Sequence, residues 1–166
     1  MKRTITVIQP ALTNSSLKLI EAGTPEGRFS FSGLLKRSAR LDLGHQRLTY
    51  TTLGLLGRAV RADAADGRTV GEFRQTGIMG RGDAEISGRH YRLKISGVLA
   101  RRFSWVDADD TETMCLKLGG MLRTRGTIEV SDTAVPEDVA VLIGLGIIAR
   151  RASESDSGGG AAAAAS

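Results

Sequence analysis

The sequence predicts a mainly β protein: an antiparallel closed barrel of about twelve strands around a buried, hydrophobic C-terminal helix. Three observations support this fold class. Many short segments alternate apolar and polar residues, short turn-forming spacers separate these segments, and one apolar segment with no polar face follows them at 135–151. Alternation with a period of two is typical of a strand that has one wet face, and short spacers favour antiparallel neighbours.

Strand-like composition recurs along the chain at spacings that are typical of a barrel or a sandwich. Within 90–96, for example, Tyr91, Leu93 and Ile95 alternate with Arg92 and Lys94. The predicted strands are 4–8, 17–21, 28–32, 40–43, 47–52, 57–62, 69–75, 84–87, 90–96, 101–106, 112–118 and 126–131.

The spacers between these segments contain residues that form tight turns. Asp66-Gly67 and Ser87-Gly88 are typical hairpin turns, and 107–112 forms a short acidic loop. The segments 58–67 and 102–111 share the form Arg-x-x-x-x-Asp-Ala-x-Asp. Each of them is predicted to be a strand that enters an acidic hairpin loop.

The segment 136–151 is the one clear helix in the sequence. Pro136 suits a first helical turn, and Glu137 and Asp138 complement the positive end of the helix dipole. Its eleven apolar residues span roughly 16 Å as a helix, about half of a bilayer core, so no transmembrane span is expected. A helix that is apolar all round belongs in an interior, and a barrel of about twelve strands is wide enough to enclose it.

Two glycine-containing motifs resemble cofactor-binding sequences, but neither is interpreted as a cofactor site. The letters GLGIIA at 144–149 match a dinucleotide fingerprint, but no βαβ unit follows them, so the glycines are interpreted as clearance for close-packed strands. The motif GIMGRG at 77–82 lacks the Gly-Lys-Ser/Thr ending of a phosphate loop and is interpreted as a turn.

Composition predicts one domain, 1–151, followed by a disordered low-complexity tail, 152–166. The N-terminal apolar run is too short for a secretory signal, so the expected compartment is the cytoplasm, with peripheral membrane association as a possibility. Cys115 is the only cysteine, which excludes an internal disulfide and a multi-cysteine metal site.

No catalytic residue, metal site or cofactor is predicted. The acidic loop 107–112 does not have the spacing of an EF-hand and is interpreted as a solvated hairpin tip. His45 and His90 lie in different predicted hairpins, and no serine stands in a nucleophile elbow. Enzyme activity is therefore not expected, although catalytic groups can converge without a motif.

Basic residues provide the strongest functional signal. The chain carries a formal net charge of +5, and a basic surface favours anionic partners. Six residues are predicted to bind an anionic ligand: Arg92, Lys94, Arg101, Arg102, Arg123 and Arg125. A generic solvated basic surface is the alternative interpretation.

About twelve strands followed by an apolar C-terminal helix resemble the tubby C-terminal-like fold, which tubby proteins, phospholipid scramblases and the LURP-one-related family share. The segments 61–74, 91–110 and 126–151 show the resemblance, and the compact chain is most similar to the LURP-one-related branch. The resemblance implies a helix threaded through a barrel. In tubby members, basic residues on the barrel exterior bind phosphoinositides, but no such signature can be placed residue by residue here.

The leading functional hypothesis is therefore a non-enzymatic binding or scaffold domain of tubby-like type. Its expected ligand is anionic phospholipid or another phosphate-containing molecule, bound on a basic barrel face. A nucleic-acid-binding β module is an alternative, although such readers usually interleave aromatic residues, which make up only 4% of this chain. An enzyme with an unrecognised site is the third possibility. The sequence does not specify the oligomeric state.

Overall fold

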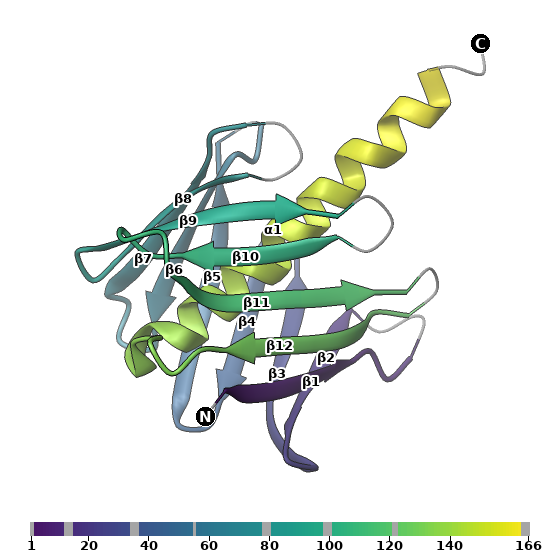
Figure 1. The fold of residues 1–166 in the computed structure, drawn as a ribbon. Coiled ribbons are helices and arrows are strands. Elements are labelled where there is room, and N and C mark those ends of the chain that lie inside the picture. Colours follow the sequence, from purple (N-terminus) through teal and green to yellow (C-terminus); the bar gives the residue numbers. More distant parts are fainter. Residues whose placement is uncertain are drawn as a thin grey trace.

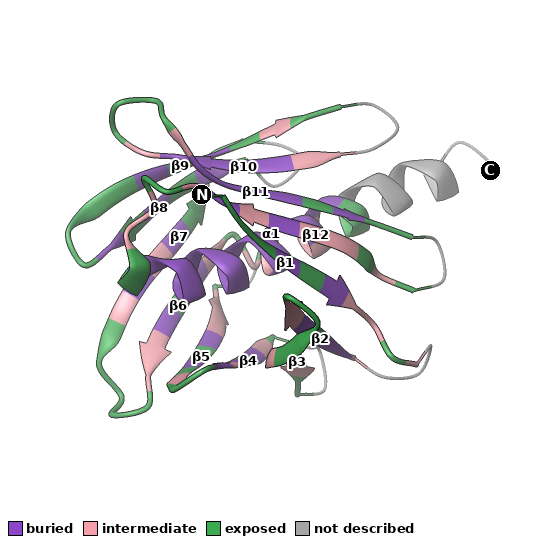
Figure 2. Cartoon of the chain, turned by 60° about the horizontal axis from the view of Figure 1, so that its bottom comes forward, coloured by how far each residue is buried: buried purple, intermediate pink, exposed green. Residues whose placement is uncertain are grey.

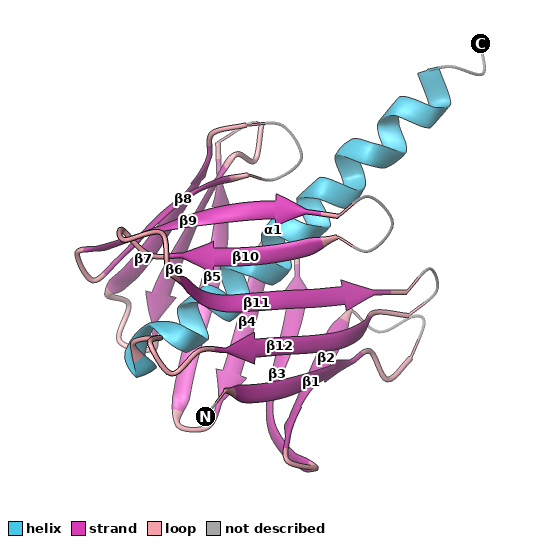
Figure 3. Cartoon of the chain, in the orientation of Figure 1, coloured by secondary structure: helices cyan, strands magenta, loops and turns pink. Residues whose placement is uncertain are grey.

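The computed structural model describes residues 2–11, 15–33, 37–54, 56–77, 81–97, 101–120 and 123–163, with side chains up to Ser155. Figures 1 and 3 show a β-barrel with one long helix running along its axis. The strands are β1 (Arg3–Ile8), β2 (Ser16–Glu21), β3 (Thr24–Ser32), β4 (Ser38–Leu43), β5 (Gln46–Leu53), β6 (Ala59–Ala64), β7 (Thr69–Gln75), β8 (Gly82–Ile86), β9 (Arg89–Ser96), β10 (Arg102–Val106), β11 (Glu112–Gly119) and β12 (Arg125–Val130), and the helix is α1 (Pro136–Ala163).

Every strand pairs antiparallel with its neighbours in sequence, and β1 pairs with β12 to close the barrel. At the closure Ile5 lies opposite Ile128, and both side chains are fully buried. The predicted fold class is confirmed, and each of the twelve predicted segments coincides with a strand within a few residues. The agreement follows from the alternation, because the same period places aliphatic side chains inside and charged ones outside.

Helix α1 fills the barrel interior. Residues 138–147 are all buried, and Figure 2 shows this part of the helix enclosed by the strands. Polar groups of two core aromatics anchor it from different strands. The Tyr50 hydroxyl on β5 donates a hydrogen bond of 2.9 Å to the Ala140 carbonyl, and the Trp105 Nε1 on β10 donates one of 3.0 Å to the Leu142 carbonyl.

The two central glycines of α1 lie where the barrel wall approaches most closely. A Cβ atom on Gly144 would lie 2.1 Å from the Tyr50 ring, and one on Gly146 would lie 2.8 Å from the Leu116 side chain. The interpretation of these glycines as clearance for the wall is therefore confirmed.

The backbone of α1 continues beyond Arg151, where the sequence predicted the end of the helix, to Ala163. The disordered tail at 152–166 stays a prediction. Low-complexity composition suggested disorder, but tertiary contacts hold the first tail residues. Ser153 is fully buried, and its carbonyl accepts a hydrogen bond of 3.4 Å from Arg101. Arg150 also forms an i,i+4 ion pair with Glu154.

The barrel has two distinct ends. The entrance end is the one at which α1 begins, and its chain connections are 22–23, 44–45, 65–68, 87–88, 107–111 and 131–135. The exit end is the one from which α1 leaves, and its connections are 9–15, 33–37, 54–58, 76–81, 97–101 and 120–124. Figure 1 shows the helix projecting from the exit end.

Within the described residues, no helix has both the length and the apolar character that a membrane crossing requires.

Candidate anionic-surface site

Three of the six predicted binding residues lie on the outer wall of β9 and β10. Arg92 lies opposite Val106, and Lys94 lies opposite Ser104 in this strand pair. Each of the three has an acidic partner nearby. The Arg92 guanidinium lies 3.7 Å from the Asp83 carboxylate, Lys94 Nζ lies 2.6 Å from that of Asp110, and Arg102 donates hydrogen bonds of 2.6 and 2.8 Å to Glu112.

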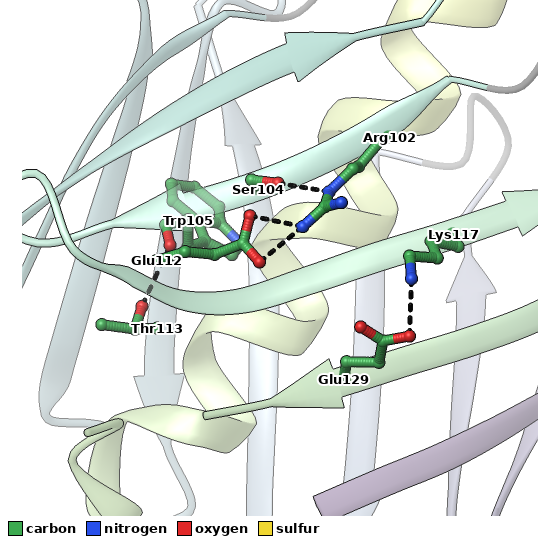
Figure 4. A network of polar contacts seen from close by, with 7 residues as sticks. All are labelled: Arg102, Ser104, Trp105, Glu112, Thr113, Lys117 and Glu129. Atoms are coloured by element: carbon green, nitrogen blue, oxygen red, sulfur yellow. Dashed lines mark hydrogen bonds and ion pairs between the residues drawn. The ribbon is translucent and has the colours of Figure 1, made fainter. Parts of the chain in front are cut away.

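The pKa values of the outer-wall acids reflect these ion pairs. The hydrogen bond from Lys94 lowers the pKa of Asp110, and the hydrogen bond from Lys117 lowers the pKa of Glu129. Figure 4 shows the Lys117–Glu129 pair beside the Arg102–Glu112 pair. Ion pairs therefore compensate Arg92, Lys94, Arg102 and Lys117 on the outer wall. An incoming phosphate would have to displace a carboxylate from each of these four cations.

Arg102 also covers the chain's only cysteine. Ser104 and Cys115 lie opposite each other on the outward side of β10 and β11, and both are buried. Arg102 Nε donates a hydrogen bond of 3.3 Å to the Ser104 hydroxyl (Figure 4). Burial raises the pKa of the Cys115 thiol, so this sulfur is kept in its unreactive protonated form.

The other three predicted residues lie at the exit end. Arg101 hydrogen-bonds Ser153 and so holds the emerging helix. Arg123 lies in the last connection, Arg125 is the first residue of β12, and both are exposed. The structure therefore does not bring the six predicted residues together on one face: Arg92, Lys94 and Arg102 lie on the wall, and Arg101, Arg123 and Arg125 lie at the exit end.

Sequence reasoning missed Arg58 and Arg81, which also lie at the exit end and are exposed. Arg58 accepts a backbone hydrogen bond of 2.7 Å from Gln75, and Arg81 accepts one of 3.0 Å from Thr76, so both are tied to neighbouring strand ends. Within the part of the chain that the structure describes, none of Arg58, Arg81, Arg123 and Arg125 has a carboxylate partner.

The sequence does contain a signal that would have identified these arginines: the distribution of charged residues between alternate connections. The six exit-end connections contain six basic residues and no acidic one: Lys36, Arg37, Arg58, Arg81, Arg101 and Arg123. The six entrance-end connections contain five acids and one base: Asp66, Asp107, Asp109, Asp110, Asp132 and Arg68. Because alternate connections of an antiparallel barrel lie at opposite ends, this alternation in sequence becomes a separation of charge in space.

Two further arginines lie at the exit end, around a cavity of about 220 Å³ between α1 and the strand ends. Arg150 is buried, and this burial lowers the pKa of its guanidinium. The Arg151 guanidinium stacks over the Phe31 ring, with 4.2 Å to the ring centroid. Glu154 lines the same cavity and forms an ion pair with Arg150, so the excess of positive charge there comes from Arg151.

At the entrance end, a polar cluster fixes the first turn of α1. Asp138 is only 1% exposed, and it accepts two hydrogen bonds of 2.6 Å from Arg89 and one of 2.6 Å from the Tyr91 hydroxyl. Burial, followed by the hydrogen bond to Asp138, raises the pKa of Tyr91 to about 12. Every oxygen of this carboxylate is engaged, so the cluster is a structural anchor of the helix.

Two open hollows of about 690 and 390 Å³ adjoin this anchor, and His45 and Glu137 line both of them. Among the described residues no hydrogen bond joins His45 to an acid, and His90 lies apart, opposite Glu85 on β8.

In the acidic loop 107–111, one carboxylate forms hydrogen bonds within the loop itself. The Asp107 side chain accepts hydrogen bonds of 3.0 and 2.9 Å from the backbone N–H groups of Asp109 and Thr111. The described residues include no group of three or more His, Cys, Asp or Glu side chains arranged to hold a metal ion. Comparison with family models, with curated proteins and with solved structures finds no match to this chain.

Proposed function

We propose that this protein is a non-enzymatic binding domain of tubby-like type that attaches through its exit end to an anionic, phosphate-bearing surface. The observation that carries the proposal is the charge of the exit-end connections, which contain six bases and no acid. A barrel with an axial helix is also what the tubby-like resemblance implies. Peripheral association with a membrane follows from the same proposal.

The exposed, uncompensated arginines are the groups that would meet such a surface. Arg58, Arg81 and Arg123 come from three different connections, and within the described chain none of them has a carboxylate to displace. Binding of an anion there costs no existing ion pair, in contrast to Arg92, Lys94 and Arg102 on the wall.

The placement of the aromatic residues favours a phosphate-bearing surface over single-stranded nucleic acid. All seven aromatic side chains lie in described segments, and six of them are buried in the core, while Phe31 is half-buried beneath Arg151. A single-strand reader stacks bases on exposed aromatic rings. The chain has no fully exposed ring for that purpose.

The test compares two triple variants that lose the same charge. Arg58→Gln/Arg81→Gln/Arg123→Gln removes three exit-end cations, and Arg28→Gln/Arg40→Gln/Arg92→Gln removes three exposed cations of the outer wall. At about 1 kcal/mol for each basic residue near an anionic membrane, we expect the first variant to bind phosphatidylserine vesicles roughly 100-fold more weakly. The wall variant should bind nearly as well as the native protein.

Vesicle flotation and binding to immobilised heparin are the measurements. Equal losses in the two variants would show that only net charge matters and would contradict the proposed site. Absence of binding to both vesicles and heparin at low salt would overturn the proposed function itself.

A further inference from the structure

The cavity of about 220 Å³ at the exit end lies where α1 passes the last residues of the barrel wall. All nine residues that line it belong to the described chain. They come from α1, from β2 and β3, and from the connections that precede β2 and β12. A cavity of about 150 Å³ is large enough to bind benzene. This one therefore has room for a single ring with one small substituent.

The lining of this cavity combines two kinds of side chain. Leu17 and Ile147 are buried apolar residues, and the half-buried Phe31 packs against the same core. Arg150 and Arg151 contribute two cations. A molecule that fills the cavity would meet hydrocarbon and positive charge together, so the lining favours a compact apolar body that carries one anionic group.

Arg150 is the unusual residue of this lining, because its charged side chain is only 9% exposed. Within the described chain its guanidinium pairs with Glu154 through Nη2 and donates a hydrogen bond of 3.4 Å to the Thr124 hydroxyl through Nη1. Its Nε has no hydrogen-bond partner among the described residues, whereas no fully buried side-chain nitrogen there lacks one. Nε is therefore accessible, and the cavity is the space that Arg150 lines.

The charges of the lining sum to one positive charge, because Glu154 is its one acid. Glu154 compensates Arg150, and Arg151 forms no ion pair with any described residue. Burial lowers the pKa of both guanidinium groups, and both stay protonated at neutral pH because an arginine is so weakly acidic. One monoanion would neutralise the cavity, whereas a phosphate dianion would leave an excess of negative charge.

Glu154 indicates which kind of anion suits the site. Its carboxylate already pairs with the buried Arg150 guanidinium, although the Glu154 side chain itself is 53% exposed. A carboxylate is planar and matches the fork of an arginine. It also loses less hydration energy than a dianion on entering a cavity lined partly by hydrocarbon. These properties favour a monocarboxylate over phosphate.

We propose that this cavity binds a small soluble monocarboxylate of about the size of benzoate, with its carboxylate held by Arg150 and Arg151 and its apolar body against Leu17, Phe31 and Ile147. The site goes beyond the proposed function, because Arg58, Arg81 and Arg123 do not line the cavity. A molecule bound there contacts the helix and the strands together, so it would stabilise the exit of α1 from the barrel.

Titration calorimetry of the native protein with sodium benzoate is the first test. Benzamide keeps the size of the probe and removes its charge, and acetate keeps the charge and removes the ring. We expect benzoate to bind at least about tenfold more tightly than either of them, because each comparison removes one of the two contributions. Inorganic phosphate should bind more weakly than benzoate. The melting temperature of the protein should rise with benzoate concentration.

Two substitutions on α1 should change the affinity for benzoate in opposite directions. Arg150→Met keeps a long side chain and removes the charge, so we expect at least about tenfold weaker binding. Glu154→Gln removes the negative charge beside the bound carboxylate, so we expect roughly two- to fivefold tighter binding. Because Glu154 is half exposed, Glu154→Gln should keep the fold, as circular dichroism would check.

Arg58→Gln is the matched control for lost charge. It removes an exposed exit-end cation that does not line the cavity, so it should bind benzoate like the native protein. Arg151→Gln, at a half-buried position, provides a second variant that should bind benzoate more weakly.

Four results would overturn the inference and leave the proposed function standing. Benzamide that binds as tightly as benzoate would show a purely apolar cavity, and phosphate that binds as tightly would contradict the choice of a monocarboxylate. Unchanged or weaker binding in Glu154→Gln would contradict the charge argument. Absence of benzoate binding to both the native protein and Glu154→Gln would remove the site. Vesicle binding of the Arg58→Gln/Arg81→Gln/Arg123→Gln variant tests the proposed function separately.

Discussion

At the scale of single residues, the barrel and its helix are matched by size. Tyr50 and Trp105 are among the largest fully buried side chains, and each donates a hydrogen bond to a helix carbonyl beside a helical glycine. The glycines cost helix propensity, roughly 1 kcal/mol each relative to alanine. The structure retains them because the Tyr50 ring at Gly144 and the Leu116 side chain at Gly146 occupy the space that a Cβ would need.

Gly144→Ala tests this match. In an ordinary helix the change would stabilise, but here the new methyl group meets the Tyr50 ring at 2.1 Å, so we expect a loss of about 1–3 kcal/mol in unfolding free energy. Urea unfolding would measure it. Gly119→Ala is the control, because nothing lies within 4 Å of its added Cβ. Unchanged or increased stability of Gly144→Ala would show that the ring has room to move.

At the scale of elements, the helix is fixed to the barrel at both of its ends. At its start the Asp138 carboxylate joins Arg89 and Tyr91 of β9, and where it leaves the barrel Arg101 joins Ser153. Between these points, hydrogen bonds from Tyr50 and Trp105 and the close packing at Gly144 also hold the helix. The polar contacts at the two ends act together with these central contacts to set its position along the axis.

Asp138→Ala tests the anchor at the helix start. The variant leaves the buried Tyr91 hydroxyl without its acceptor and removes the partner of Arg89, so we expect a loss of about 2–4 kcal/mol in unfolding free energy. Lys117→Ala is the control, because its ion pair with Glu129 is exposed and should contribute less than about 1 kcal/mol. Similar losses in both variants would contradict the anchor.

At the scale of the whole molecule, the barrel is polarised along its axis. The rim around the helix exit is basic and the opposite rim is acidic, while ion pairs compensate much of the wall between them. Such a charge distribution orients a molecule toward an anionic surface before contact.

Alkaline pH should weaken the whole fold through its buried tyrosines. The folded state raises the pKa of Tyr91 from 10.0 to about 12, and burial also raises the pKa of Tyr50. Below pH 10 the phenols are neutral in both states. Above pH 10 the unfolded state binds fewer protons, so stability falls as pH rises toward 12, by on the order of 1–2 kcal/mol for Tyr91.

Urea unfolding at a series of pH values would measure this slope. Tyr91→Phe has no ionisable phenol at that position, so its stability should be lower than native at neutral pH and should fall less steeply between pH 10 and 12. Parallel curves for the native protein and the variant would show that Tyr91 does not contribute to alkaline unfolding.

Much of the fold could be predicted because it depends on local pattern. Alternation such as Tyr91, Leu93 and Ile95 places each strand, and the short turns force neighbouring strands to pair in order. The end of the helix could not be predicted in this way. Ser153 is buried and contacts Arg101, which is 52 residues away in sequence. Composition alone cannot predict such a contact.

The candidate site, like the fold, could be predicted from the sequence only in part. Sequence alone determined the strands, the enclosed apolar helix and the excess of basic residues, because periodicity and charge are properties of short segments. Only the tertiary structure decided which cations are compensated: Lys94 on β9 meets Asp110 in the connection between β10 and β11, and Arg102 on β10 meets Glu112 on β11. Closure of the barrel then gathers separate loops at one rim, because strand order and register, not proximity in sequence, determine which charges become neighbours.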